Sequence, residues 1–297
     1  MSDYDGRGVE TTAGRRTDAV RFFMSAVKAP VSREAFFAAL LTIGFANALI
    51  DSCLYTVQTD GWLNALIETF GVSVFLWGAC VAAVIKSLKG QVSSPVRQAD
   101  LAVGALLCLG FLVPVSLLSW ATLGALAPYL YFSSRGSPAL KAAAIIALAA
   151  MLPSIWGRLV FAVVGSHVLH LDALLVGSIM GTAVIGNTVA FREGSDVLII
   201  YSPCSSVHNV SLAIMWLTTV VTFQDRKWNF RSVSYCLAAC AAVVAINVCR
   251  MAVMTLSVEW YELAHGPVGA NIANWLNVVA ILIIGFQAMR NDAPETR

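Results

Sequence analysis

Long runs of apolar residues, separated by short polar stretches, dominate the hydrophobicity pattern of this chain. Such runs predict membrane-spanning helices, because about 20 apolar residues are enough to cross the hydrocarbon core of a bilayer. Eight spans are predicted, at residues 36–57, 62–85, 101–119, 121–132, 139–157, 205–223, 233–257 and 271–289. The fourth has about half the usual length. The predicted fold class is an all-α polytopic membrane protein.

The same pattern divides the chain into five segments. They are a polar leader (1–35), five N-terminal transmembrane helices (36–157), an outer-face segment (158–203), a second group of transmembrane helices (204–289) and a polar tail (290–297). Residues 158–190 are apolar but interrupted by glycines and polar side chains, so they predict helices that lie in the interface or re-enter the membrane. Residues 192–203 predict a polar turn followed by a short extended stretch.

Composition supports the membrane class. Hydrophobic residues make up 58% of the 297 positions and charged residues only 12%, whereas soluble domains carry about 25% charge. The mean hydropathy is +0.76. These values exclude a soluble globular protein, a nucleic-acid binder and a disordered chain.

The basic residues predict the orientation of the chain through the positive-inside rule. If the N-terminus is cytoplasmic, nearly all of the 19 Lys and Arg residues lie on the cytoplasmic side. The exceptions are Arg158, Arg192 and Arg250. Removing span 121–132 would place the basic segment 224–232 outside, so charge supports the short helix. Both termini are therefore predicted to be cytoplasmic, in the inner membrane of a bacterium.

This topology brings three chemically distinctive residues to the outer face. Six of the seven cysteines lie inside apolar runs, but Cys204 begins the sixth span. Arg250 lies near the outer end of the seventh span, and Asn247, three residues earlier, shares its helix face. His265 follows in the last outer loop. Charged residues within spans are costly and indicate function by default.

A Cys, a His and an Arg on one membrane face suit acyl transfer through a thioester. The thiolate is the reactive form of Cys204, and a nearby cation lowers the pKa of a thiol. His265 can act as base and then as acid, while Arg250 can stabilise an oxyanion. Asn247, Arg158 and Ser205 are candidate supporting residues.

Several alternatives accompany this hypothesis. Arg250 can instead snorkel to lipid headgroups, and His208, one turn after Cys204, is a second candidate base. His167 and His170 share a helix face but have no nearby third ligand for zinc, and no metal or cofactor is predicted. The acids Glu259 and Glu262 flank His265, and they are expected either to be solvated loop carboxylates or to orient His265 or an incoming substrate.

The C-terminal part of the chain resembles the exosortase/archaeosortase family. The resemblance rests on the run from Gly186 to Leu217, on AINVCRMAVM and on His265, and it covers residues 158–289. The family pattern is an outer Cys in a Cys-Ser-Gly-like motif, an Asn-x-x-Arg helix and a late His or Arg. Here these positions are Cys204, Asn247 with Arg250, and His265, which favours the exosortase branch.

The resemblance implies a membrane-embedded cysteine transpeptidase or endopeptidase. Its expected partner is an exported protein with a C-terminal tripartite signal, which is a short motif, a transmembrane helix and a basic tail. The implied acceptor is lipid-linked or polysaccharide-linked. One departure is Ser206 in place of the glycine of the Cys motif, and Ser206 is expected to cap the sixth helix.

Two other functions fit the same composition. A transporter or channel would use Arg250, Asn247, Glu68 and Asp51 along a polar path. A non-catalytic component of an exopolysaccharide assembly system would need no reactive Cys204.

Overall fold

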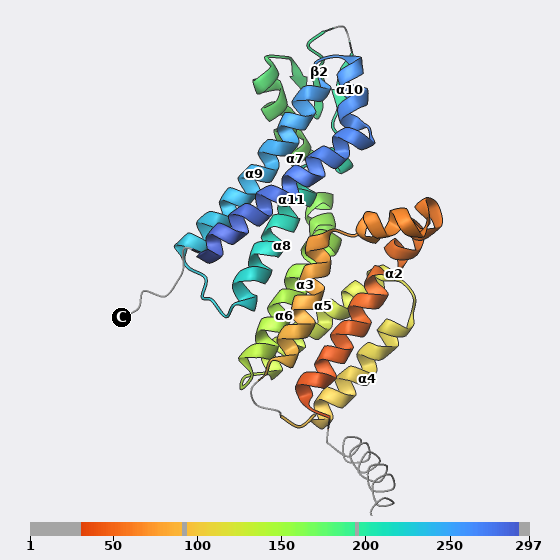
Figure 1. Cartoon of the computed structure of the whole chain (residues 1–297), viewed down its shortest axis with the longest axis vertical. Coiled ribbons are helices and arrows are strands. Elements are labelled where there is room, and N and C mark those ends of the chain that lie inside the picture. Colours follow the sequence, from red (N-terminus) through yellow and green to blue (C-terminus); the bar gives the residue numbers. More distant parts are fainter. Residues whose placement is uncertain (1–30, 91–93, 194–195, 291–297) are drawn as a thin grey trace, which may run out of the picture.

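The computed structural model describes residues 31–90, 94–193 and 196–290, and it shows a bundle of long apolar helices (Figure 1). Four helical stretches are long and apolar enough to cross a membrane, and shorter apolar helices accompany them. By helix length and hydropathy the chain is a multi-pass membrane protein. The predicted leader (1–35) and tail (290–297) lie almost entirely outside the described residues.

The helices follow the predicted order, with a small sheet between the helices labelled α7 and α8. Their bounds are α2 (Arg33–Ile67), α3 (Val74–Leu88), α4 (Gln98–Leu112), α5 (Ser116–Ser133), α6 (Pro138–Ala150), α7 (Gly157–Met180), α8 (Val207–Phe223), α9 (Phe230–Met254), α10 (Val258–His265) and α11 (Pro267–Arg290). The strands are β1 (Val184–Ile185), β2 (Thr188–Ala190) and β3 (Val197–Ile199).

Several of the predicted span boundaries are wrong. The third span, predicted at 101–119, ends at Leu112, and residues 116–119 already belong to α5. The first helix continues past residue 57 to Ile67, with a break at Gly61, whose φ of 77° is outside the helical range. The helix that corresponds to the second predicted span, α3, begins at Val74 instead of residue 62. The predicted short helix 121–132 is longer than expected, because α5 has 18 residues.

The outer-face segment differs most from its prediction. Residues 157–180 form one continuous helix that follows α6 through a π-helical segment, Leu152–Trp156, and no re-entrant turn interrupts it. Pro153 lies in this segment and has no N–H for regular helix bonding. Residues 184–190, expected to be helical, form the β1–β2 hairpin. The extended stretch predicted within 192–203 is confirmed as β3.

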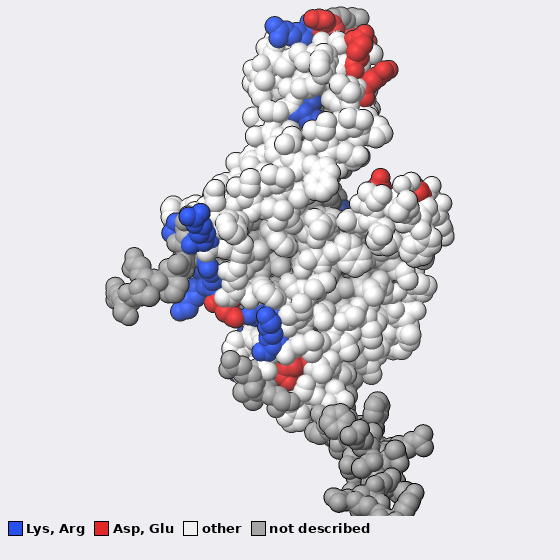
Figure 2. All heavy atoms as spheres, viewed as in Figure 1, with Lys and Arg blue, Asp and Glu red and all other residues white. Residues whose placement is uncertain are grey.

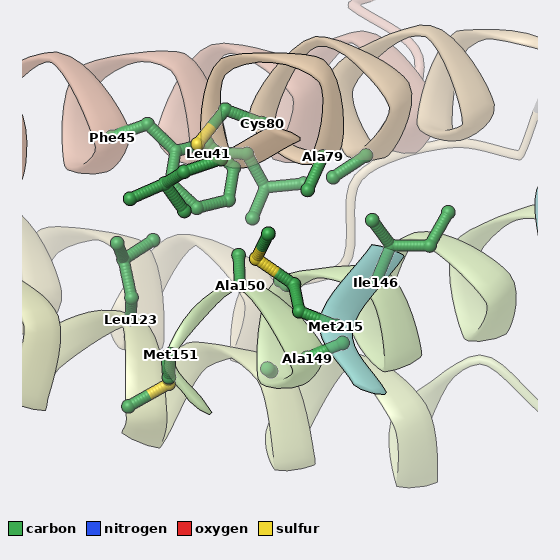
Figure 3. Close-up of a cluster of buried hydrophobic side chains, with 14 of the residues drawn as sticks. Leu41, Phe45, Ala79, Cys80, Leu123, Ile146, Ala149, Ala150, Met151 and Met215 are labelled. Atoms are coloured by element: carbon green, nitrogen blue, oxygen red, sulfur yellow. The ribbon is translucent and has the colours of Figure 1, made fainter. Parts of the chain in front are cut away.

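The core of the bundle combines large apolar side chains with several alanines. Ala79 of α3 and Ala149 and Ala150 of α6 are buried, as is Met215 of α8. Figure 3 shows these residues between the helices together with Leu41, Phe45 and Leu123. Small residues let helix backbones approach closely in a bilayer, where dispersion contacts replace the hydrophobic driving force.

A buried ion pair ties three helices together at the end where α2 begins. Arg33 is 1% exposed and Asp100 is fully buried. The Arg33 guanidinium donates to both carboxylate oxygens of Asp100, at 2.8 and 3.0 Å, and to the Ser134 hydroxyl at 2.9 Å. Tyr129 donates to the same carboxylate at 2.8 Å. This network joins α2, α4 and α5.

Candidate functional site

A cavity of about 620 Å³ lies at the end of the molecule formed by β3, α10 and the turn before α8. Figure 1 shows β2 and α10 side by side at this end, beyond the helices α2–α6. Cys204 and His265 both line the cavity. The two residues come from different helices, so the tertiary fold joins them. Arg250 does not line the cavity.

A short 3₁₀ turn, Ser202–Cys204, holds the candidate nucleophile just before α8. The Cys204 amide donates to the Tyr201 carbonyl at 2.9 Å. The side-chain amide of Asn247 donates to the Cys204 carbonyl at 2.7 Å and to the Ser206 hydroxyl at 3.1 Å. Asn247, buried on α9, therefore fixes the backbone on which the thiol is carried.

Asp172 of α7 completes this buried network. Its carboxylate accepts from the Ser206 amide at 3.2 Å and from the Ser206 hydroxyl at 3.0 Å. Ser206 is the N-cap residue of α8, but its hydroxyl makes no capping bond to a helix amide. The expected cap is therefore wrong, because the hydroxyl donates to Asp172. Ser205 is also buried, and its hydroxyl accepts from the Val207 amide at 3.4 Å.

Arg250 holds the end of α10 on which His265 lies. Its Nε donates to the Ala264 carbonyl at 2.9 Å. Within the described residues no hydrogen bond occupies the terminal nitrogens of Arg250, which leaves them free to bind an anion. The neighbouring His265 ring stacks on Tyr261 at a centroid distance of 5.1 Å and an interplanar angle of 11°. The segments that carry Cys204 and His265 are thus linked through the contacts of Asn247, Arg250 and Ala264.

The other candidates lie outside this arrangement. His208 is an exposed residue in the first turn of α8 with Arg158 as a charged neighbour, and it does not line the cavity. His170 Nδ1 hydrogen-bonds with the Gly186 carbonyl at 2.6 Å, which ties α7 to the β1–β2 turn. Among the described residues, no three His, Cys, Asp or Glu side chains form a group that could hold a metal ion.

The flanking acids are exposed. Glu259 accepts from the Ser257 hydroxyl at 2.6 Å, and this hydrogen bond lowers the pKa of the Glu259 carboxyl below its usual value. Glu262 lies on the exposed side of α10. Neither carboxylate forms a hydrogen bond with His265 in the described part of the chain.

Two contributors to the site escaped the sequence analysis. Asp172 is one of the polar side chains that interrupt the apolar segment 158–190, and Tyr261 belongs to none of the motifs. An acidic residue in an apolar helix was the available signal for Asp172. The partner of Asp172, Ser206, lies on another element, so the bond depends on how α7 and α8 meet.

Comparison with known protein families, curated proteins and solved structures finds no match to this chain.

Proposed function

We propose that the chain is a membrane-embedded cysteine transpeptidase or endopeptidase of the exosortase type, acting at the outer face of a bacterial inner membrane. The observation that carries the proposal is the cavity shared by Cys204 and His265. Support comes from the contacts of Asn247 with the Cys204 carbonyl and of Arg250 with the residue beside His265.

In the proposed reaction, Cys204 Sγ attacks a substrate carbonyl while the thiol proton passes to His265. The terminal nitrogens of Arg250, which does not line the cavity in the substrate-free structure, reach the oxyanion in the substrate complex and stabilise it. The C–N bond of the substrate then breaks, and the imidazolium gives its proton to the leaving amine. An acceptor hydroxyl, amine or water attacks the resulting thioester and releases the Cys204 thiol. No hydrogen bond joins Cys204 to His265 in this structure, so the substrate complex must bring them closer.

The proposed substrate is an exported protein with the tripartite C-terminal signal described above. Its transmembrane helix would lie beside the bundle, and its cleavable motif would enter the cavity from the outer side. The proposed orientation follows from the positions of the basic residues. In it, eight helices cross the membrane: α2, α3, α4, α5, α6, α8, α9 and α11.

The transport alternative is less well supported. Asp51 accepts a hydrogen bond from the Ser116 amide at 3.1 Å, and Glu68 is an exposed residue at the end of α2. The contacts of the described residues connect only Asn247 and Arg250 to the cavity. A transport path needs polar groups spread through the membrane depth. The contacts of Asp51, Glu68, Asn247 and Arg250 do not join these side chains into such a path.

The test measures the alkylation rate of Cys204 by a membrane-impermeant sulfonated maleimide, followed by mass spectrometry. The reference is a Ser202→Cys variant in a Cys204→Ser background, because Ser202 is an exposed residue of the same turn. We expect Cys204 at neutral pH to react at least about tenfold faster than the reference thiol, because His265 in the same cavity can take the thiol proton as Cys204 attacks the maleimide.

His265→Ala should remove this advantage, whereas His208→Ala should leave it unchanged. Equal rates for Cys204 and the reference cysteine would contradict the proposal and favour the non-catalytic assembly role.

A further inference from the structure

Strand β3 forms one edge of the small sheet, whose strand order is β1-β2-β3. Leu198 and the following Ile200 are buried in the cluster beneath the sheet. Val197 and Ile199 are 52% and 40% exposed. The side of β3 that faces away from β2 has no neighbouring strand among the described residues.

The register shows which backbone groups face this open side. Ile200 donates its N–H to the Asn187 carbonyl, and Phe191 donates to the Asp196 carbonyl, both at 2.9 Å. Hydrogen-bonded pairs alternate along an antiparallel ladder. Leu198 therefore also bonds toward β2, opposite Val189. The N–H and C=O groups of Val197 and Ile199 consequently point outward.

This open edge lies along the candidate site. Val197, Ile199 and Tyr201 line the cavity that contains Cys204 and His265. Val258 and Tyr261 of α10 line it as well. The cavity thus lies between a row of outward backbone groups and the helix that carries the proposed base.

We propose that the edge of β3 binds the substrate as an extended peptide, which adds a fourth strand to the sheet and leads its scissile bond to Cys204. This inference rests on the proposed cysteine chemistry and specifies how the substrate is recognised. Four outward groups, the N–H and C=O of Val197 and Ile199, fit a peptide backbone. Strand addition obtains affinity from main-chain hydrogen bonds and selectivity from pockets for alternate side chains.

The location of the edge supports this ligand over a glycan or a lipid chain. Proteins normally protect open strand edges, because an unpaired row of N–H and C=O groups attracts other chains. Here the edge is kept open, with apolar side chains, directly before the turn that carries the thiol. Main-chain pairing in this place would hold the carbonyl of a bound peptide in a fixed register next to Cys204.

The experiment compares two probes on the purified full-length protein in detergent. One is acetyl-Ala-Ala-Ala chloromethyl ketone, from which the thiolate of Cys204 displaces chloride to form a thioether. The other carries methyl groups on its two internal amides, so it cannot donate the same hydrogen bonds. We expect the unmodified probe to label Cys204 about tenfold faster, because each lost hydrogen bond weakens binding by a factor of about 2 to 10.

A matched pair of variants tests the edge itself. Ile199→Pro removes the outward N–H but leaves the β2–β3 ladder intact, since proline is tolerated on the open side of an edge strand. Ile199→Ala removes the side chain and keeps the N–H. We expect the proline variant to lose about fivefold of the labelling rate with the unmodified probe, and the alanine variant to lose less than twofold.

The small maleimide separates failure of this inference from failure of the proposed function. If Cys204 reacts fast with the maleimide but equally with both peptide probes, the strand-addition inference is wrong and the cysteine chemistry stands. If Cys204 reacts slowly with the maleimide as well, the proposed function itself is wrong. The N-methylated probe is tested on the unchanged chain, so misfolding of a variant cannot hide either outcome.

Discussion

At the residue scale, the buried carboxylate of Asp172 is the group on which the geometry of the candidate site depends. It is 3% exposed, and both of its oxygens accept hydrogen bonds from Ser206. Ser206 in turn accepts from Asn247, which also holds the Cys204 carbonyl. A buried network of this kind is stabilising only while every member has its partner.

We predict that Asp172→Asn destabilises the chain by about 1–3 kcal/mol. One of the two carboxylate oxygens that accept hydrogen bonds from Ser206 is replaced by an NH₂ group, which can only donate. The free energy of unfolding in detergent micelles measures this cost. The maleimide rate of Cys204 should fall severalfold in the same variant, since the turn loses its support.

The matched control is Glu262→Gln, an exposed acid of α10 whose side chain makes no hydrogen bond in the described part of the chain. It should change neither quantity. A fully stable Asp172→Asn protein with unchanged Cys204 reactivity would show that Ser206 and Asn247 hold the turn without the carboxylate.

The residues of the site differ in how far the sequence could predict them. Cys204, Arg250 and His265 could be placed at one end of the molecule because charge determines topology and each is an unusual residue in an apolar chain. The same reasoning could not separate His265 from His208 by contact, since that depends on the cavity. Asp172 acts through Ser206 on another element, and a single sequence does not show that contact. Tyr261 and His265 are four residues apart on α10, so helical spacing was the available signal for their stacking.

At the element scale, the close approach of α7 to the β1–β2 hairpin decides where the sheet lies. Gly177 is fully surrounded, and a Cβ on it would overlap the Val184 side chain of β1 and approach the Thr182 carbonyl at 3.2 Å. Only a residue without a side chain allows the hairpin to dock so tightly. The hairpin in turn positions β3 and the cavity.

We predict that Gly177→Ala destabilises the chain by about 1 kcal/mol. Overpacking at a tight contact costs about 1–3 kcal/mol, which outweighs the roughly 1 kcal/mol that alanine gains over glycine inside a helix. Chemical unfolding in micelles provides the measurement.

The sign of the effect should reverse in a Val184→Ala background, because the shorter side chain makes room for the new Cβ. Gly136→Ala, where a Cβ would meet no atom within 4 Å, is the control for a glycine without contacts. Equal destabilisation by Gly177→Ala in both backgrounds would place the clash elsewhere than at Val184.

The elements themselves were predicted well where apolar length decides them. The spans that became α4, α6, α8, α9 and α11 overlap their predictions, since long apolar runs in a membrane form helices. The start of α3 was missed because residues 62–67 are apolar yet complete α2 beyond the break at Gly61. The hairpin was missed because a short apolar run has no periodicity that separates strand from helix.

At the scale of the whole molecule, the charges separate into two groups. Figure 2 shows mostly Lys and Arg side chains, with some acidic ones, near the ends of α8, α9 and α11 that lie away from the sheet. At the far end beside α10 it shows mostly acidic side chains together with some Lys or Arg. A broad surface between the two groups carries hardly any charge (Figure 2). This distribution fits a bilayer around the middle of the bundle, and the positive-inside rule predicts that the end with more Lys and Arg lies in the cytoplasm.

We predict that Lys89 and Lys227 share one side of the membrane and Glu262 lies on the other. Lys89 follows α3 and Lys227 follows α8, so four further crossings, α4, α5, α6 and α8, separate them. Single cysteines at these positions, in a background that lacks all seven native cysteines, test the topology with a membrane-impermeant maleimide on cells before and after permeabilisation. The Glu262→Cys protein should be labelled in intact cells, and the Lys89→Cys and Lys227→Cys proteins only after permeabilisation.

The two lysine positions also test the shortest predicted span. If α5 did not cross the bilayer, the crossings between the two positions would be odd in number, and Lys227→Cys would be labelled in intact cells while Lys89→Cys would not. An inverted chain would give the opposite pattern at all three positions and would place the cavity of Cys204 in the cytoplasm. An exported protein could not then reach it, so the topology decides whether the proposed substrate class is physically accessible.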